Sequence, residues 1–186
     1  MFRRTATEME YLKAPDGLAA EGLFGFSVSL DNDGGRLLVG APRAAEDGRA
    51  FLYSRVAADD VYGQPIELQA GYRANVISFG RALVLSPSGT LAFVSSEDRQ
   101  GRVHVFGLAV DDTPSAGAGP EEWKVLQVLR SASPVAEEES FGTVISVDRQ
   151  GRFVAVGAPE ADSSAASIGG ISPGSVYIFE RESSAE

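Results

Sequence analysis

A short pair of motifs repeats along the chain with constant spacing, and this repetition constrains the fold more than any other feature. Phe24-Gly25 is followed by Gly40-Ala41-Pro42, and Phe141-Gly142 is followed by Gly157-Ala158-Pro159. In both cases the second motif begins fifteen positions after the glycine of the first. Self-similarity of this kind is typical of repeat architectures, in which each unit packs against its neighbours.

A third copy lies between these two. Phe79-Gly80 begins it, and the same interval leads to Ser95-Ser96-Glu97 in place of Gly-Ala-Pro. Each copy then ends in an aromatic segment led by glycine: GRAFLY from Gly48, GRVHVF from Gly101 and GSVYIF from Gly174. Because three features recur in one order, we interpret the chain as three copies of one unit.

Each copy resolves into four short strand-like segments. Residues after Phe-Gly alternate and end in the turns DNDGG, SPSG or DRQG, which suit tight hairpins. The apolar runs RLLVG, TLAFV and RFVAVG then have the length of buried strands. EMEYLKA, QPIELQA and EWKVLQVLR precede the three Phe-Gly pairs. The pattern predicts an all-β fold, a β-propeller segment of three four-stranded antiparallel blades, with repeats at about 8–55, 64–108 and 122–181 of a single segment 1–186.

Packing explains the constant spacing. Side chains alternate between the two faces of a strand, so a one-residue insertion would turn half of them to the wrong face. The phenylalanine is suited to the space between adjacent blades, and its glycine permits close approach of another backbone. Proline can end a strand where no ladder donor is needed. The spacing therefore predicts a scaffold and carries no chemistry by itself.

These motifs resemble the FG-GAP repeat, the blade of the β-propeller in integrin α chains and in many bacterial and protist surface proteins. EEWKVLQVL, FGTVISV, FVAVGAP and GSVYIFER in the third copy are especially similar to the bacterial type. The resemblance extends over about residues 8–181. It implies a module for adhesion, ligand binding or protein assembly without catalysis by the propeller, and it implies an extracellular or cell-surface location. The first fifteen residues contain two arginines but no apolar run, so they do not predict a secretory signal.

The number of copies leaves the closure of the ring open. Propellers have about 4–8 blades, and three copies are fewer than that. The first strand-like segment, at 8–13, has no preceding blade, and the third copy has no such segment after it. Two copies of the chain could complete each other as a six-bladed homodimer. Alternatively, the sequence is part of a longer propeller that supplies further blades.

Charge and composition narrow the classes of partner. The formal net charge is −10, which disfavours nucleic acid and anionic lipid as partners. There is no cysteine and only one histidine, so thiol catalysis and His-rich metal clusters within the chain are excluded. No stretch has the length and hydropathy of a membrane span. A protein partner or an extracellular ligand is the remaining expectation.

Acidic residues gather in the loops that should emerge on one face of the propeller. Loops carry binding function more often than the scaffold does, and an acidic face favours a basic partner or a divalent cation. For any single residue, solvated surface is the competing interpretation. The predicted ligand-binding residues are Glu46, Asp47, Glu97, Asp98, Glu137, Glu138, Glu139, Glu160 and Asp162.

Calcium is a weaker candidate at the first hairpin. Asp31 and Asp33 offer carboxylates there, but Gly35 and Val39 offer no side-chain oxygen where further ligands are wanted. Calcium takes about 6–8 oxygen ligands, so a tight turn is the preferred interpretation and no cofactor is predicted.

No catalytic residues are predicted. His104 aligns with the aromatic residues Phe51 and Tyr177 of the other copies, which indicates a structural side chain, and Trp123 fits strand packing. The leading interpretation is therefore a non-catalytic binding or adhesion module. Two alternatives stay open: an intracellular structural subunit that docks through open propeller edges, and an accessory segment of a larger enzyme.

Overall fold

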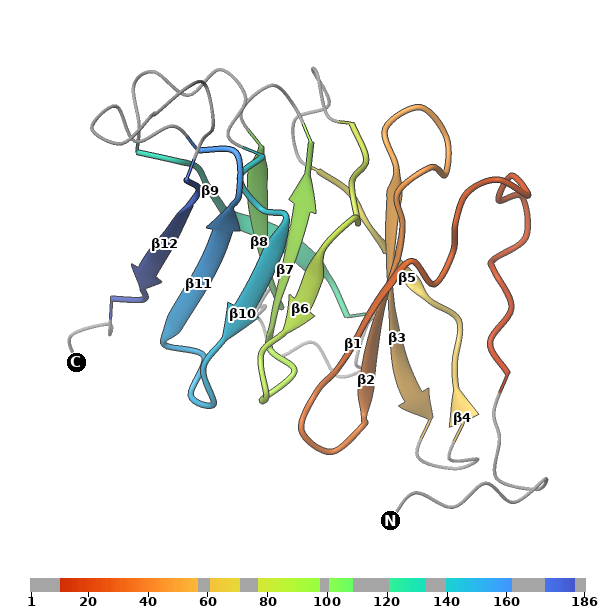
Figure 1. Cartoon of the computed structure of the whole chain (residues 1–186). Helices are drawn as coiled ribbons and strands as arrows, with labels where there is room; N and C mark the ends of the chain where they lie inside the picture. The colour runs from red at the N-terminus through yellow and green to blue at the C-terminus, as the bar shows by residue number, and fades with distance from the viewer. Residues whose placement is uncertain are drawn as a thin grey trace, which may run out of the picture.

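The chain forms three antiparallel β-sheets that lie side by side (Figure 1). The computed structural model describes residues 11–56, 61–70, 77–97, 101–108, 121–132, 140–161 and 173–182. Within these ranges every regular element is a strand, and no helix occurs. The described segments accordingly contain no helix long and apolar enough to cross a membrane. The predicted all-β fold class is confirmed, and the arrangement is that of a β-propeller-like segment.

The three sheets follow one another along the chain, and each contains the hairpin that follows one Phe-Gly pair. The first contains β1 (Ser27–Leu30), β2 (Arg36–Ala41), β3 (Arg49–Val56), β4 (Val61–Tyr62) and β5 (Ile66–Leu68). The second contains β6 (Leu83–Leu85), β7 (Leu91–Ser96), β8 (Arg102–Leu108) and β9 (Trp123–Leu129). The third contains β10 (Val144–Val147), β11 (Phe153–Ala158) and β12 (Ser175–Glu180).

The sheets differ in their outer strands, so a uniform count of four strands does not hold. β5 pairs with β3 and β9 pairs with β8, so the segment before each of the later Phe-Gly pairs completes the preceding sheet. β4 is a short addition that pairs with the end of β3. Within the described residues β12 has β11 as its one neighbour. In the part of the chain that the structure describes, the third sheet therefore lacks the outer strand that the other two possess.

The first strand-like segment is a correction to the sequence interpretation. Its described part, residues 11–13, is not a strand. Leu12 instead packs against an apolar cluster on the outer face of the first sheet. Among the described residues the nearest aromatic strand, β3, already pairs with β5, so its edge is not available to this segment.

The fifteen-residue spacing corresponds to the register of a hairpin. In the first sheet the Gly25 amide donates to the Gly40 carbonyl at 3.0 Å, and in the third the Gly142 amide donates to the Gly157 carbonyl at 3.0 Å. In the second, the Gly80 amide donates to the Ser95 carbonyl at 2.9 Å. The two motifs therefore meet across the hairpin in all three copies, and the spacing is a register constraint.

The side chain six residues after the motif glycine stabilises the hairpin turn in the second and third copies. Ser86 Oγ accepts a hydrogen bond from the Leu91 amide at 3.0 Å. Asp148 Oδ1, at the equivalent position of the third sheet, accepts from the Arg152 amide at 2.7 Å and the Phe153 amide at 2.9 Å. These amide donors, first among them Phe153, lower the pKa of the Asp148 carboxyl from its ordinary value of 3.8.

The Asp148 carboxylate makes stability depend on pH in a defined direction. Its pKa is lower in the folded chain, so its contribution is complete above 3.8 and is lost as the pH falls through the folded value. Asp148→Ala should lower the midpoint of thermal unfolding at about pH 7 and should have little effect at about pH 2. Thermal unfolding followed by circular dichroism measures both. An equal loss at the two pH values would show that the charged carboxylate does not support this turn.

Two apolar cores lie between the sheets. The first joins Leu38 and Leu52 of the first sheet to Phe79, Leu83 and Leu85 of the second copy. The second joins the second sheet to the third, and includes Phe93, Val103, Val105, Phe141, Val154 and Val156. Each of these two joints therefore has buried side chains from both of the copies that it connects.

Candidate functional site

The chain turns sharply at each Phe-Gly pair, and we call this turn the Phe-Gly corner. Each corner lies at one end of its sheet. The residue before each phenylalanine has a positive φ: 55° at Leu23, 53° at Ser78 and 50° at Ser140. The motif glycines follow at 87°, 90° and 94°. A left-handed backbone conformation is costly for residues with a side chain, so the backbone geometry favours glycine at this position of the motif. The ring contacts that result are Phe24 with Phe51 and Tyr53, Phe79 with His104 and Phe106, and Phe141 with Tyr177 and Phe179.

The joint between the first and second sheets is closed at this end. Ser27 Oγ donates to the Gly80 carbonyl at 2.7 Å, and the Phe79 amide donates to the Asp47 carbonyl at 2.8 Å. A β-carbon built on Gly40 would lie 2.0 Å from the Gly80 carbonyl oxygen. This approach is possible because Gly40 has no side chain.

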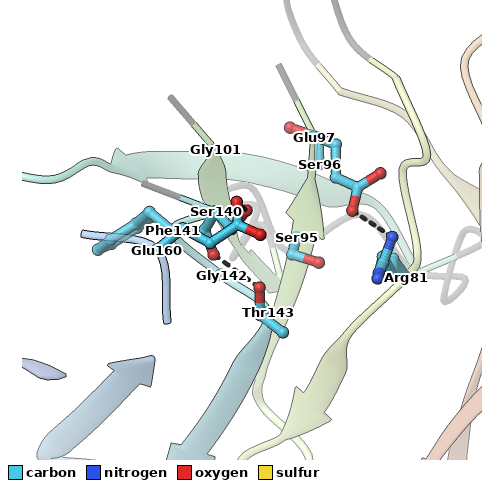
Figure 2. Close-up of a pocket in the computed structure, with 10 residues that line it drawn as sticks. All are labelled: Arg81, Ser95, Ser96, Glu97, Gly101, Ser140, Phe141, Gly142, Thr143 and Glu160. Atoms are coloured by element: carbon cyan, nitrogen blue, oxygen red, sulfur yellow. Dashed lines mark hydrogen bonds and ion pairs between the residues drawn. The ribbon is translucent and has the colours of Figure 1, made fainter. Parts of the chain in front are cut away.

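The joint between the second and third sheets is open at the same end. Ser95 replaces the first glycine of Gly-Ala-Pro here, and a β-carbon on Gly142 would lie 3.1 Å from the Ser95 β-carbon. Beside this contact is a pocket of about 300 Å³ (Figure 2). It is lined by Arg81, Ser95, Ser96, Glu97, Gly101, Ser140, Phe141, Gly142, Thr143 and Glu160.

The pocket combines two carboxylates, one guanidinium and several hydroxyls. Arg81 forms an ion pair with Glu97 across the second copy (Figure 2). Ser140 Oγ donates to Glu160 Oε2 at 2.5 Å, and Thr143 Oγ1 donates to the Ser140 carbonyl at 2.7 Å. The acids exceed the cation by one, and their remaining lone pairs can accept further hydrogen bonds. The site therefore favours a group with a positive charge or several donors.

The structure brings together two of the acids predicted to bind ligand. Glu97 and Glu160 come from different copies and line the same pocket. Asp47 lies at the other joint, where Arg49 Nη1 donates to Asp47 Oδ1 at 3.1 Å, and Glu46 is exposed nearby in the chain. Asp98, Glu137, Glu138, Glu139 and Asp162 lie outside the described residues. A binding role for these acids stays a prediction.

Several residues of the pocket were not among the sequence candidates. Arg81 belongs to the second copy, whereas Ser140 and Thr143 belong to the third, and their adjacency depends on how the sheets pack. One signal was present in the sequence. Ser95-Ser96-Glu97 departs from Gly-Ala-Pro, and these are the residues that line the open joint.

The first hairpin, considered as a calcium site, has two carboxylates. Asp33 Oδ1 accepts from the Gly35 amide at 3.0 Å, and this bond is the main cause of a lowered pKa for Asp33. Asp31 Oδ1 is buried without a hydrogen-bond partner. In the described part of the chain no three His, Cys, Asp or Glu side chains cluster as a metal site would require. The described residues therefore add no third carboxylate to Asp31 and Asp33 at this hairpin.

His104 and Trp123 occupy packing positions. His104 is buried opposite Val94, at the register position that Phe51 and Tyr177 hold opposite Val39 and Val156. Its Nε2 lies 3.0 Å from Ser96 Oγ. Trp123 begins β9 and packs against the first core, with the Arg36 guanidinium 5.6 Å from its ring centre. Neither residue lines the pocket between the second and third sheets.

Three antiparallel sheets follow one another along the chain, each begins at a Phe-Gly pair, and neighbouring sheets pack against each other. This arrangement defines an all-β repeat protein of the propeller-like class. The family model of the FG-GAP repeat matches residues 6–53, so the resemblance seen in the sequence is confirmed there. FG-GAP repeats suggest a protein-interaction or adhesion type of module, and domains built from them are generally non-catalytic. Among curated proteins, none matched the chain.

Proposed function

We propose that the chain is a non-catalytic protein-binding module that takes a basic side chain of its partner into the pocket between the second and third sheets. The observation that supports this most is the convergence of Glu97 and Glu160 there, where Ser95 replaces the glycine that closes the other joint. The FG-GAP resemblance supports an adhesion role at a cell surface or toward an extracellular ligand.

The size and exposure of the pocket favour one group of a larger partner. Its volume of about 300 Å³ is at the lower end for sites that enclose a small molecule. The side chains of Glu97 and Arg81 are 44% and 46% exposed. Half-exposed ion pairs contribute only about 0.2–1 kcal/mol each, so useful affinity requires contacts around the pocket as well. A protein surface that presents a lysine or arginine supplies both.

The negative net charge of the chain also attracts a basic partner over distances longer than those of direct contact. At −10, the chain attracts cationic surfaces and repels acidic ones. Such steering weakens with ionic strength, because the screening length falls to about 8 Å at physiological salt. Association with a basic partner should therefore be faster at low salt.

The pocket does not favour acid–base catalysis. In the described structure its two carboxylates are already engaged, Glu97 by Arg81 and Glu160 by Ser140. General acid–base catalysis needs a group with a suitably shifted pKa, aligned on a reacting atom. The geometry supports binding better than it supports catalysis.

Removing either carboxylate charge tests the proposal. Glu97→Gln and Glu160→Gln should each weaken binding of a tetralysine peptide about 2–5-fold, which corresponds to one half-exposed charge. Calorimetry or fluorescence anisotropy with labelled tetralysine measures the change at low ionic strength. Tetraglutamate serves as the charge-reversed probe and should not bind.

The control is a charge-matched variant away from the pocket. Glu122 is exposed immediately before β9, where it pairs with Lys124 at 3.1 Å, and Glu122→Gln should leave the tetralysine affinity unchanged. If all three variants lose affinity equally, the general negative charge of the chain attracts the peptide and the pocket has no specific role.

A further inference from the structure

The second copy places a pair of opposite charges where the other two copies have neither. Arg81 stands directly after the motif glycine, a position that a phenylalanine and a threonine hold in the first and third copies. Glu97 stands where those copies have the proline of Gly-Ala-Pro. The two side chains form an ion pair at the edge of the pocket between the second and third sheets. Because the other two sheets form without such a pair, the repeat architecture does not require it.

The main chain on both sides of this ion pair is held by backbone hydrogen bonds. The Ile77 amide donates to the Glu97 carbonyl at 2.8 Å, and the Glu97 amide donates to the Ile77 carbonyl at 2.6 Å. The Arg81 amide donates to the Ser78 carbonyl at 3.1 Å. The ion pair therefore joins only the two side chains, and their separation would leave these backbone bonds of the pocket wall in place.

The ion pair is accessible from the pocket. Figure 2 shows the Glu97 carboxylate turned toward the Arg81 guanidinium, with Ser140 and Glu160 on the other side of the pocket. Both members of the pair are about half-exposed, so water can solvate each charge once they separate. Exposed ion pairs of this kind are weak for that reason. A cation that enters the pocket can therefore compete for Glu97 at little cost.

We propose that Arg81 is an internal competitor for the basic side chain that the pocket binds. In the free chain the Arg81 guanidinium neutralises Glu97, and in the complex the partner's cation pairs with Glu97 while Arg81 turns into solvent. This inference rests on the proposed function, because it concerns regulation of the same pocket. Arg81 lowers the affinity for an isolated cation, so only a partner with further contacts around the pocket displaces it effectively.

The chemistry of arginine gives Arg81 no supporting role toward a basic ligand. A guanidinium has five N–H donors and no acceptor, so it forms no hydrogen bond with an ammonium or with another guanidinium. It also repels an approaching cation, most strongly where the two share one carboxylate. Loss of a positive charge anywhere on the chain would attract a basic peptide somewhat more. The test therefore needs a control with the same change in net charge.

The experiment measures the affinity of the full chain for tetralysine by calorimetry at low ionic strength. Arg81→Gln should raise the affinity about 2–5-fold, because Glu97 is then free in the unbound chain. Arg152→Gln is the matched control and should raise the affinity less than about twofold. Arg152 pairs with Glu180 at the other end of the third sheet, and their side chains are 57% and 53% exposed. Circular dichroism of each variant verifies that it is folded.

A double substitution separates competition for Glu97 from repulsion through space. In a chain that carries Glu97→Gln, Arg81 has no carboxylate to occupy at this position. Adding Arg81→Gln to that chain should therefore raise the tetralysine affinity no more than Arg152→Gln does. Equal gains with and without Glu97 would show that Arg81 acts only as a distant positive charge, and they would overturn the proposal.

The remaining outcomes separate this inference from the proposed function. If Glu160→Gln weakens tetralysine binding while Arg81→Gln has no more effect than Arg152→Gln, the pocket binds the cation but Arg81 is not a competitor. A lower affinity of the Arg81→Gln chain would show that Arg81 supports the bound state, which also overturns the inference. If neither Glu97→Gln nor Glu160→Gln weakens binding, the pocket is not the binding site, and the proposed function fails together with the inference.

Discussion

Gly40→Ala is expected to lower the free energy of unfolding by about 3 kcal/mol, at the upper end of the usual cost of overpacking. The new methyl group would lie 2.0 Å from the Gly80 carbonyl oxygen and 2.3 Å from Ser27 Oγ. Backbone on one side and a hydrogen-bonded serine on the other leave the methyl group little space. The first and second sheets must therefore separate, and the Ser27–Gly80 hydrogen bond is lost. Urea unfolding followed by circular dichroism measures the change, and the midpoint of thermal unfolding should fall by roughly 6–12 °C.

Gly157→Ala is the matched control for this substitution. It changes the same residue type at the same repeat position, but the nearest atoms would be 3.7 Å from the methyl group. We expect no loss in the free energy of unfolding, or a gain of up to about 1 kcal/mol, because alanine reduces the backbone freedom of the unfolded chain. If the two variants had equal effects, the close approach at the first joint would not be what fixes glycine in this motif.

The second large effect is expected for Phe79→Ala. Phe79 is 2% exposed, packs against His104 and Phe106, and belongs to the core between the first and second sheets. Truncation leaves a cavity in that joint, and phenylalanine-to-alanine changes in cores cost about 3–5 kcal/mol. Chemical denaturation with urea gives the free energy of unfolding for both proteins.

Phe24→Ala provides the comparison within the same motif. Phe24 contacts Phe51 and Tyr53, but it is half-buried, since the described residues place no second sheet against it. We expect its truncation to cost about half as much as that of Phe79, in proportion to the apolar area that it buries. Similar losses of unfolding free energy at the two positions would mean that packing within one sheet, and not packing between two sheets, determines how much the phenylalanine stabilises the fold.

The sequence predicted the local parts of the fold well, because they depend on contacts within one copy. Constant spacing requires a constant register, and the hydrogen bond between Gly25 and Gly40 recurs in each hairpin for that reason. The alignment of His104 with Phe51 and Tyr177 predicted its place in the aromatic strand, since strand parity decides which face a side chain occupies. The outer strands of the first and second sheets, β5 and β9, could be inferred in the same way.

The candidate site could be predicted only in part, because it forms between copies. Arg81 and Glu97 lie in one copy and Ser140 and Thr143 in the next, and no spacing along the chain places them together. The acidic residues of the loops gave two of the lining carboxylates, Glu97 and Glu160. The departure at Ser95-Ser96-Glu97 marked the position, but its effect depends on how far the two sheets separate. The segment at 8–13 was predicted as a strand from its pattern, but its described part, 11–13, is not one, and in the described structure the nearest aromatic strand β3 pairs with β5 instead.

The most direct test of the proposed binding function is a titration of the isotopically labelled chain with tetralysine, followed by amide chemical shifts in nuclear magnetic resonance. We predict that the perturbed amides cluster at Ser95, Ser96 and Glu97 on one side of the pocket and at Ser140 and Thr143 on the other. The amides around Glu122 should not move. Perturbations spread evenly over the acidic surface, or confined to the closed joint around Gly40 and Gly80, would contradict a binding site between the second and third sheets.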